Sequence, residues 1–219
     1  DNKITNRFDQ LRNLAMTMGI LPLVAVLALV LSLAVTVADA NAVDYHTDTG
    51  SGTYGGKATN WGACNDPNAG DVGILTTAGG YSCADARVDH AVSAGAAIME
   101  FVSTAAYGSD MELSNVTLNA YIRENDGDQS DQVRMEVGYY TGGTFTVLGS
   151  DTVSNPADRE TQTFTMSGVL GTAPNGSYLG LRAISVTATN GDRIYLGTAD
   201  DSSGSIRFSV TETPDAGCT

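Results

Sequence analysis

The feature that most constrains this chain is an uncharged segment that runs from Leu14 to Ala38. Its only hydroxyl side chains are those of Thr17, Ser32 and Thr36. As an α-helix the segment would extend roughly 37 Å, which is enough to cross the ~30 Å hydrocarbon core of a bilayer. No face of this helix would be polar, so the segment is not an amphipathic surface helix. It must therefore be surrounded by lipid or by copies of itself.

Three interpretations of this segment compete. It is a cleaved secretory signal with Arg7 and Arg12 as its basic region, a permanent transmembrane anchor, or the central helix of a filament. We expect one of the last two, because the segment is present in the chain and a cleaved signal would be absent. Basic residues precede the segment and aspartates follow it. This asymmetry places everything after residue 40 outside the cytoplasm at the moment of membrane insertion.

In the filament interpretation, subunits leave the membrane and bury these helices against one another. The expected assembly core consists of apolar side chains spread along the segment: Leu14, Ile20, Leu23, Val26, Leu27, Val30, Leu33 and Val37. We expect three parts in the chain: a hydrophobic helix over 1–42, a Gly/Thr/Asn-rich connector over 43–70, and a β domain over 71–219.

The pattern from about residue 71 onward has a period of two. Val116, Leu118 and Ala120 alternate with polar residues, and the runs 133–139 and 206–210 do the same. Such alternation is typical of half-buried strands. Turn signals such as Gly-Gly and Asn-Gly separate the runs. The sequence therefore predicts a mainly β fold: an antiparallel β-sandwich of about eight to ten short strands.

The charge of the chain is strongly acidic, with a formal net charge of −14 at pH 7. Residues 1–42 are balanced, so this charge lies on the part after the hydrophobic segment. Such a surface repels nucleic acid, which excludes DNA or RNA as a partner. A lysine-poor, aspartate-rich exterior suits a salty medium, where charges are screened, and favours a halophile. An ordinary acidic ectodomain is the alternative.

Two resemblances follow from these patterns. The last third of the chain, around Gly191-Asp192-Arg193 and its neighbouring strands, is similar to the closing hairpins of jelly-roll modules on extracellular proteins. The layout of a hydrophobic amino-terminal helix followed by a β-sandwich resembles archaeal type IV pilins and related filament subunits. This chain departs from that family because the largely polar residues 1–13 precede its hydrophobic segment. The resemblance implies a cell-surface filament with a role in adhesion or surface attachment.

Candidate covalent sites lie in the part expected to be exported. Cys64 and Cys83 close a short loop, and thiols oxidise outside the cytoplasm, so we expect a disulfide between them. Cys218 is the odd cysteine and could link subunits or pair with one of the others. Asn115 and Asn175 stand in Asn-X-Ser/Thr sequons and are candidate glycosylation sites.

The best metal candidate is the cluster of Asp126, Asp128 and Asp131, which offers hard oxygen ligands around a glycine, as Ca²⁺ requires. A solvated hairpin loop is the alternative, since no glutamate completes an EF-hand. We expect no other cofactor. No nucleophile-elbow, phosphate-loop or zinc-protease motif occurs, so we expect no enzyme. Trp61, Tyr139 and Tyr140 could stack on sugars. The alternative for Trp61 is a plug over an edge of the sandwich, and the alternation predicts that Tyr139 points inward and Tyr140 outward.

The sequence thus predicts a homopolymeric extracellular filament, with membrane residence before assembly and glycans or surfaces as further partners. The alternative is a membrane-anchored module, on a cell or a virion, that binds a carbohydrate or a protein.

Overall fold

The computed structural model describes residues 40–48, 50–61, 71–77, 94–124, 132–154, 160–187, 194–197 and 207–215. The chain divides into two compact units, Asp1–Ala38 and Asp39–Thr219. Every described residue belongs to the second unit, so the expected assembly core lies outside the described residues. In the part of the chain that is described, no helix is both long and apolar enough to cross a membrane.

The second unit is mainly β, as predicted. Its described residues form strands β1 (Asn41–Asp48), β2 (Gly52–Tyr54), β3 (Lys57–Thr59), β4 (Asp71–Thr76), β5 (Ala97–Ala106), β6 (Met111–Glu124), β7 (Gln132–Thr141), β8 (Thr144–Ser154), β9 (Glu160–Ala173), β10 (Tyr178–Thr187), β11 (Ile194–Gly197) and β12 (Arg207–Pro214).

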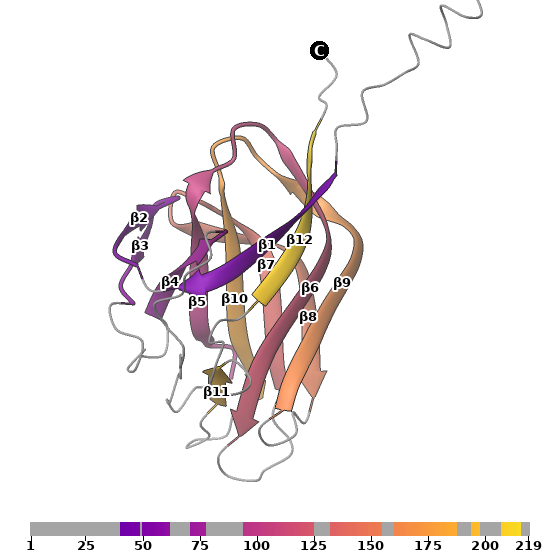
Figure 1. The fold of residues 1–219 in the computed structure, drawn as a ribbon. Coiled ribbons are helices and arrows are strands. Elements are labelled where there is room, and N and C mark those ends of the chain that lie inside the picture. The colour runs from indigo at the N-terminus through magenta and orange to yellow at the C-terminus, as the bar shows by residue number, and fades with distance from the viewer. Residues whose placement is uncertain are drawn as a thin grey trace, which may run out of the picture. The chain divides into compact units, whose positions relative to one another are not determined.

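Ten of these strands form one continuous sheet. Its order is β8-β7-β10-β5-β4-β1-β12-β6-β9, and β11 continues the position of β12 along β6. Figure 1 shows the sheet curling until its two end strands, β8 and β9, lie side by side. All pairs are antiparallel except β4 and β5, which are parallel. The prediction of a purely antiparallel, two-sheet sandwich is corrected on both points, since the strands form one mixed sheet that curves nearly into a barrel.

The seam between β8 and β9 is closed by side chains instead of a backbone ladder. The Thr165 amide of β9 donates a hydrogen bond to Asp151 Oδ2 of β8 at 2.8 Å. Leu148 lies against Gly171, where an added Cβ would meet its Cδ2 at 2.9 Å. Leu170 lies against Gly149 in the same way. The glycines thus leave room for leucines that fill the seam.

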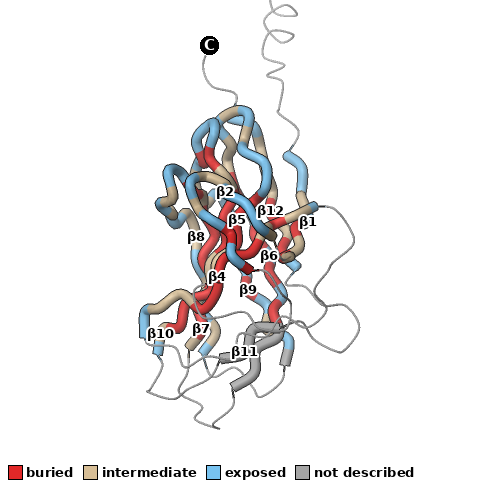
Figure 2. The backbone as a smooth tube through the Cα atoms, turned by 90° about the vertical axis from the view of Figure 1, so that its left-hand side faces the viewer, coloured by how far each residue is buried: buried red, intermediate tan, exposed pale blue. Residues whose placement is uncertain are grey.

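The core lies inside the curled sheet, and the predicted alternation places its side chains there. Val116, Leu118 and Ala120 of β6 are at most 1% exposed. Val133, Met135 and Val137 of β7 and Phe208 and Val210 of β12 are buried as well. Figure 2 shows buried stretches running through the inner strands of the sheet, such as β5, β7 and β10. The period-two prediction is therefore confirmed for these strands.

The range 43–70, expected as a connector, contributes strands to the fold. β1 lies in the middle of the sheet, paired with β12 on one side and β4 on the other. Val43, Tyr45 and Thr47 alternate inward, and Tyr45 stacks on Phe208 with ring centroids 5.4 Å apart. β2 and β3 form a hairpin of their own. In its described part, this range belongs to the domain and does not merely lead to it.

Candidate functional site

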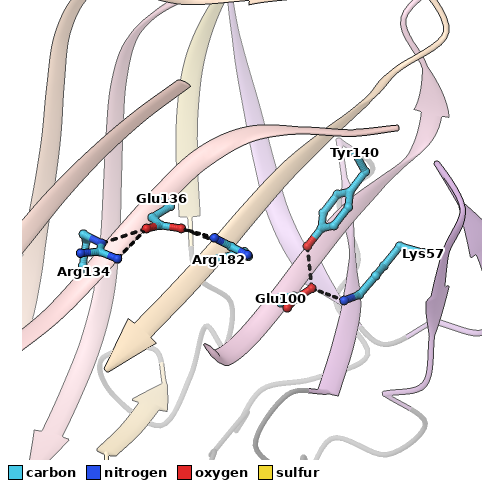
Figure 3. Close-up of polar contacts among 6 residues, drawn as sticks. All are labelled: Lys57, Glu100, Arg134, Glu136, Tyr140 and Arg182. Atoms are coloured by element: carbon cyan, nitrogen blue, oxygen red, sulfur yellow. Dashed lines mark hydrogen bonds and ion pairs between the residues drawn. The ribbon is translucent and has the colours of Figure 1, made fainter. Parts of the chain in front are cut away.

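The largest polar constellation in the described residues lies on the outer face of the sheet. We call it the outer-face cluster, and Figure 3 shows its six members: Lys57, Glu100, Arg134, Glu136, Tyr140 and Arg182. They come from β3, β5, β7 and β10. Strand alternation places the five members from β5, β7 and β10 there, because their neighbours in sequence, such as Phe101 and Val137, point into the core. Lys57 comes from the separate β2–β3 hairpin.

Glu136 anchors one half of the cluster. Its Oε1 accepts hydrogen bonds from Arg134, whose Nη2 lies 2.9 Å away, and its Oε2 lies 2.6 Å from Arg182 Nη2. The pairing of β10 with β7 sets Arg182 directly opposite Glu136. The Glu136 side chain is only 6% exposed, whereas those of Arg134 and Arg182 are 38% and 26% exposed. A carboxylate this buried requires such partners to remain charged.

Glu100 anchors the other half. The Tyr140 hydroxyl donates a hydrogen bond to Glu100 Oε2 at 2.7 Å, and Lys57 forms an ion pair with the same oxygen. The Lys57 ammonium also lies 5.8 Å from the centre of the Tyr140 ring. Burial raises the pKa of Tyr140, and the negative charge of Glu100 raises it further. Tyr140 is therefore a neutral hydrogen-bond donor at physiological pH.

Aromatic rings connect the two halves. Phe145 of β8 lies 4.9 Å from Tyr140 between ring centroids, and the Arg182 guanidinium lies 4.3 Å from the Phe145 centroid. Gly180 makes this possible, because a Cβ there would lie 2.5 Å from Phe145 and 2.8 Å from Tyr140. Tyr140 also packs with Val72 and Val102 in a second apolar cluster, to which Tyr54 of the β2–β3 hairpin adds its ring.

The chemistry available to the outer-face cluster is that of an anion-binding surface. Its three cations outnumber its two carboxylates, and each cation is more exposed than the carboxylate it pairs with. The surface it presents is therefore positive. Among the described residues no group of three or more His, Cys, Asp or Glu side chains could hold a metal ion.

A second polar group lies near the end of the curled sheet where β1 begins. The hydroxyls of Tyr45 and Tyr107 both donate hydrogen bonds to Glu212 Oε1, at 2.9 and 2.7 Å. Burial raises the pKa of both tyrosines, and the charge of Glu212 raises it further. This group joins β1, β12 and the segment after β5, which is a structural role.

The predicted covalent and metal sites are mostly outside the described residues. These are the disulfide of Cys64 and Cys83 and the metal candidates Asp126, Asp128 and Asp131. Both sequon asparagines are described and exposed. Asn115 lies at an irregularity of β6 with φ of 47°, and its Oδ1 accepts a hydrogen bond from the Gly168 amide. Asn175 lies in a turn whose Ser177 hydroxyl is buried and donates to Pro174 O at 2.5 Å.

The sugar-stacking prediction for Trp61 and Tyr140 is wrong. Both side chains are at most 1% exposed. Trp61 packs edge-on against Phe101 with ring centroids 5.9 Å apart, and Gly73 leaves room for it. Trp61 therefore plugs the core, which was the alternative, and Tyr140 is held on the opposite side of the sheet by the β2–β3 hairpin.

Sequence reasoning did not find the outer-face cluster. Its one local signal is the spacing of Arg134 and Glu136, which places both on the same face of one strand. Known proteins give no further guide: no protein-family model matches this chain, and no curated protein matches it.

Proposed function

We propose that this chain is a structural subunit of an extracellular, pilus-like filament. The residues before β1 form a helix whose apolar side chains pack in the centre of the fibre, and the curled sheet, which begins at Asn41, forms the outer sheath. The observation that most supports this proposal is that the uncharged segment and the β domain are close together in sequence. Only Asp39 and Ala40 separate the uncharged segment from β1, which is hydrogen-bonded on both sides.

This short connection supports the proposal through chain geometry. Two residues span at most about 7 Å, so packing the helices of several copies would bring their β domains together. A sheath of such domains shields the apolar helices from water. At roughly 25 cal/mol for each Å² of apolar surface buried, a packed segment of this length contributes tens of kcal/mol. Such a fibre would resist dissociation.

The surface of the domain suits a sheath exposed to the medium. In the described part of the chain, only two large apolar side chains are exposed, Val147 and Val169. The net charge of −14 would keep separate fibres apart. The proposed role is adhesion or surface attachment. Before assembly the subunit resides in the membrane, and Asn115 and Asn175 carry glycans.

A second candidate function is a membrane-anchored module that binds a partner, in which the segment stays in lipid. The observation that favours it is the outer-face cluster, whose half-buried cations offer a site for an anionic ligand on an otherwise acidic domain.

Electron microscopy of the purified full chain tests the proposal. The filament function predicts uniform fibres, and Val26→Asp should abolish them by placing a charge in the packed helices. Thr141→Asp is the matched control, because it adds the same charge at an exposed position of the β domain and should leave fibres intact. Detergent-dependent monomers from the wild-type chain, or normal fibres from Val26→Asp, would contradict the filament function.

A further inference from the structure

The cations of this acidic domain are gathered on one surface. Of the cationic side chains that the structure describes, Lys57, Arg134 and Arg182 belong to the outer-face cluster, and Arg207 lies elsewhere, at the start of β12. The partner carboxylates of the cluster are 13% and 6% exposed, whereas the cations are 26% to 38% exposed. The solvent therefore meets a positive surface on a chain with a net charge of −14.

This surface also has unused hydrogen-bonding capacity. Arg134 directs Nε and Nη2 toward Glu136 Oε1. A guanidinium carries five N–H donors, so others remain for an incoming carboxylate, which it binds best in a bidentate manner. Val147 of β8, which is 43% exposed, pairs in register with Gly138, two residues along β7 from Glu136. An acidic group on a polypeptide fits such a surface.

A matching acidic surface lies at the end of the domain where β12 finishes. We call it the acidic end, and it consists of Asp110, Glu112 and Asp215. The Asp215 amide donates a hydrogen bond to Asp110 O at 2.8 Å, and Glu112 pairs in register with Thr213 of β12. Asp110 and Asp215 are exposed. None of the four described cationic side chains lies here, because Arg207 is at the opposite end of β12.

We propose that the acidic end of one copy docks on the outer-face cluster of a second copy. The two surfaces differ, so the contact is heterologous and can repeat from copy to copy in an open fibre. The inference rests on the proposed function, of which it names the contact between neighbouring β domains. Charge complementarity supplies the argument: the cations of the outer-face cluster are more exposed than the carboxylates they pair with, and no described cationic side chain lies at the acidic end.

Self-association of the full chain in mild detergent tests this contact separately from fibre formation, because the micelle shields the hydrophobic segments. Sedimentation should show a mass that rises with protein concentration at about 0.02 M salt. The association should weaken at about 0.5 M salt, where the screening length falls to a few ångströms. Glu112→Lys combined with Asp215→Lys should weaken it about tenfold or more, because attraction becomes repulsion.

The matched control is Asp44→Lys, which makes the same type of charge change on β1. Asp44 is exposed and pairs with Ser209, four residues along β12 from Thr213, or about 13 Å away. This variant should associate like the wild-type chain. Adding Arg134→Glu to the double variant should restore association, because the charges are then exchanged across the contact. A thermal melt of each variant shows whether its fold is intact.

The outcomes separate this contact from the filament function. Wild-type association of the Glu112→Lys, Asp215→Lys variant, or association indifferent to salt, would overturn the contact even if fibres form and Val26→Asp abolishes them. Conversely, suppose that no fibres form but association depends on salt and is rescued by Arg134→Glu. The filament function would then be contradicted, and the contact would be supported.

Discussion

Three tyrosines that donate to carboxylates, of which Tyr45 and Tyr140 are buried and Tyr107 is half-buried, make the stability of this domain fall at alkaline pH. Tyr45 and Tyr107 donate to Glu212, and Tyr140 donates to Glu100. Burial and the adjacent negative charge raise the pKa of each hydroxyl above its ordinary value of 10.0. Ionising any of them in the folded state would place a phenolate beside a carboxylate in a poorly hydrated site.

The direction and size of the effect follow from proton linkage. In the unfolded chain these tyrosines release their protons near pH 10, whereas in the folded chain they hold them to higher pH. Their contribution to stability is therefore complete below pH 10 and is lost as the pH rises above it. Each tyrosine lowers the free energy of unfolding by about 1.4 kcal/mol per pH unit, so the three together lower it by about 4 kcal/mol per unit.

Urea unfolding of the full chain in mild detergent, at pH values from 7 to 11.5, measures this slope. Trp61 is the only tryptophan of the chain and is 1% exposed, so its fluorescence reports the β domain alone. Lysine titration adds little to this slope, since Lys3 and Lys57 are the only lysines of the chain. Tyr107→Phe should lower stability at pH 7 through the lost hydrogen bond, and it should also reduce the alkaline slope by about a third.

The tyrosinate absorbance of the folded chain gives the decisive comparison. If all nine tyrosines ionise near pH 10 while Trp61 fluorescence remains native, then burial does not protect the three hydroxyls and the reasoning fails. An unfolding free energy that stays constant from pH 9.5 to 11.5 would refute it as well.

Two further predictions concern the sheet itself. Gly138→Ala should cost about 3 kcal/mol or more, measured by the urea midpoint, because the new Cβ would lie 1.9 Å from the backbone Thr146 O. Gly108→Ala, whose Cβ would meet nothing within 4 Å, is the control, and equal midpoints for both would contradict the predicted clash. Asp151→Ala should cost about 1 kcal/mol and promote oligomers in size-exclusion chromatography, because the Thr165 amide at the sheet edge loses its acceptor. A variant with the elution volume and the stability of the wild-type chain would show that this carboxylate does not protect the seam.

The strands that were predicted correctly from the sequence are those whose apolar–polar alternation lies within the strand itself. Val116, Leu118 and Ala120 alternate with polar side chains because one face of β6 meets the core and the other meets water. The Gly142-Gly143 turn is also local, and both glycines have the positive φ values that a tight hairpin requires.

What the sequence could not predict depends on partners far away in the chain. β1 looked like part of a connector because most of it lies in a Gly/Thr/Asn-rich range, and only its partners β12 and β4 make it a central strand. The parallel pairing of β4 with β5 has no local signal.

The outer-face cluster shows the same limit. Tyr140 and Glu100 are 40 residues apart, and Arg182 and Glu136 are 46 residues apart. Alternation places each of them on the outer face, but the strand order brings them together. Tyr140 was predicted to point outward and does so, yet the β2–β3 hairpin and its neighbours bury it.

The pairing of β1 with β12 has a consequence for how the domain forms. Tyr45 and Glu212, which meet across these strands, are separated by 167 residues. At a synthesis rate of about 5–20 residues per second, β1 waits roughly ten seconds or longer for its partner to emerge. The strand that directly follows the uncharged segment can pair with β4 early, but its pairing with β12 must wait for residues 207–214. Removing residues 207–215 would therefore leave β1 held by β4 alone, and the link between the sheet and the uncharged segment would lose one of its two ladders.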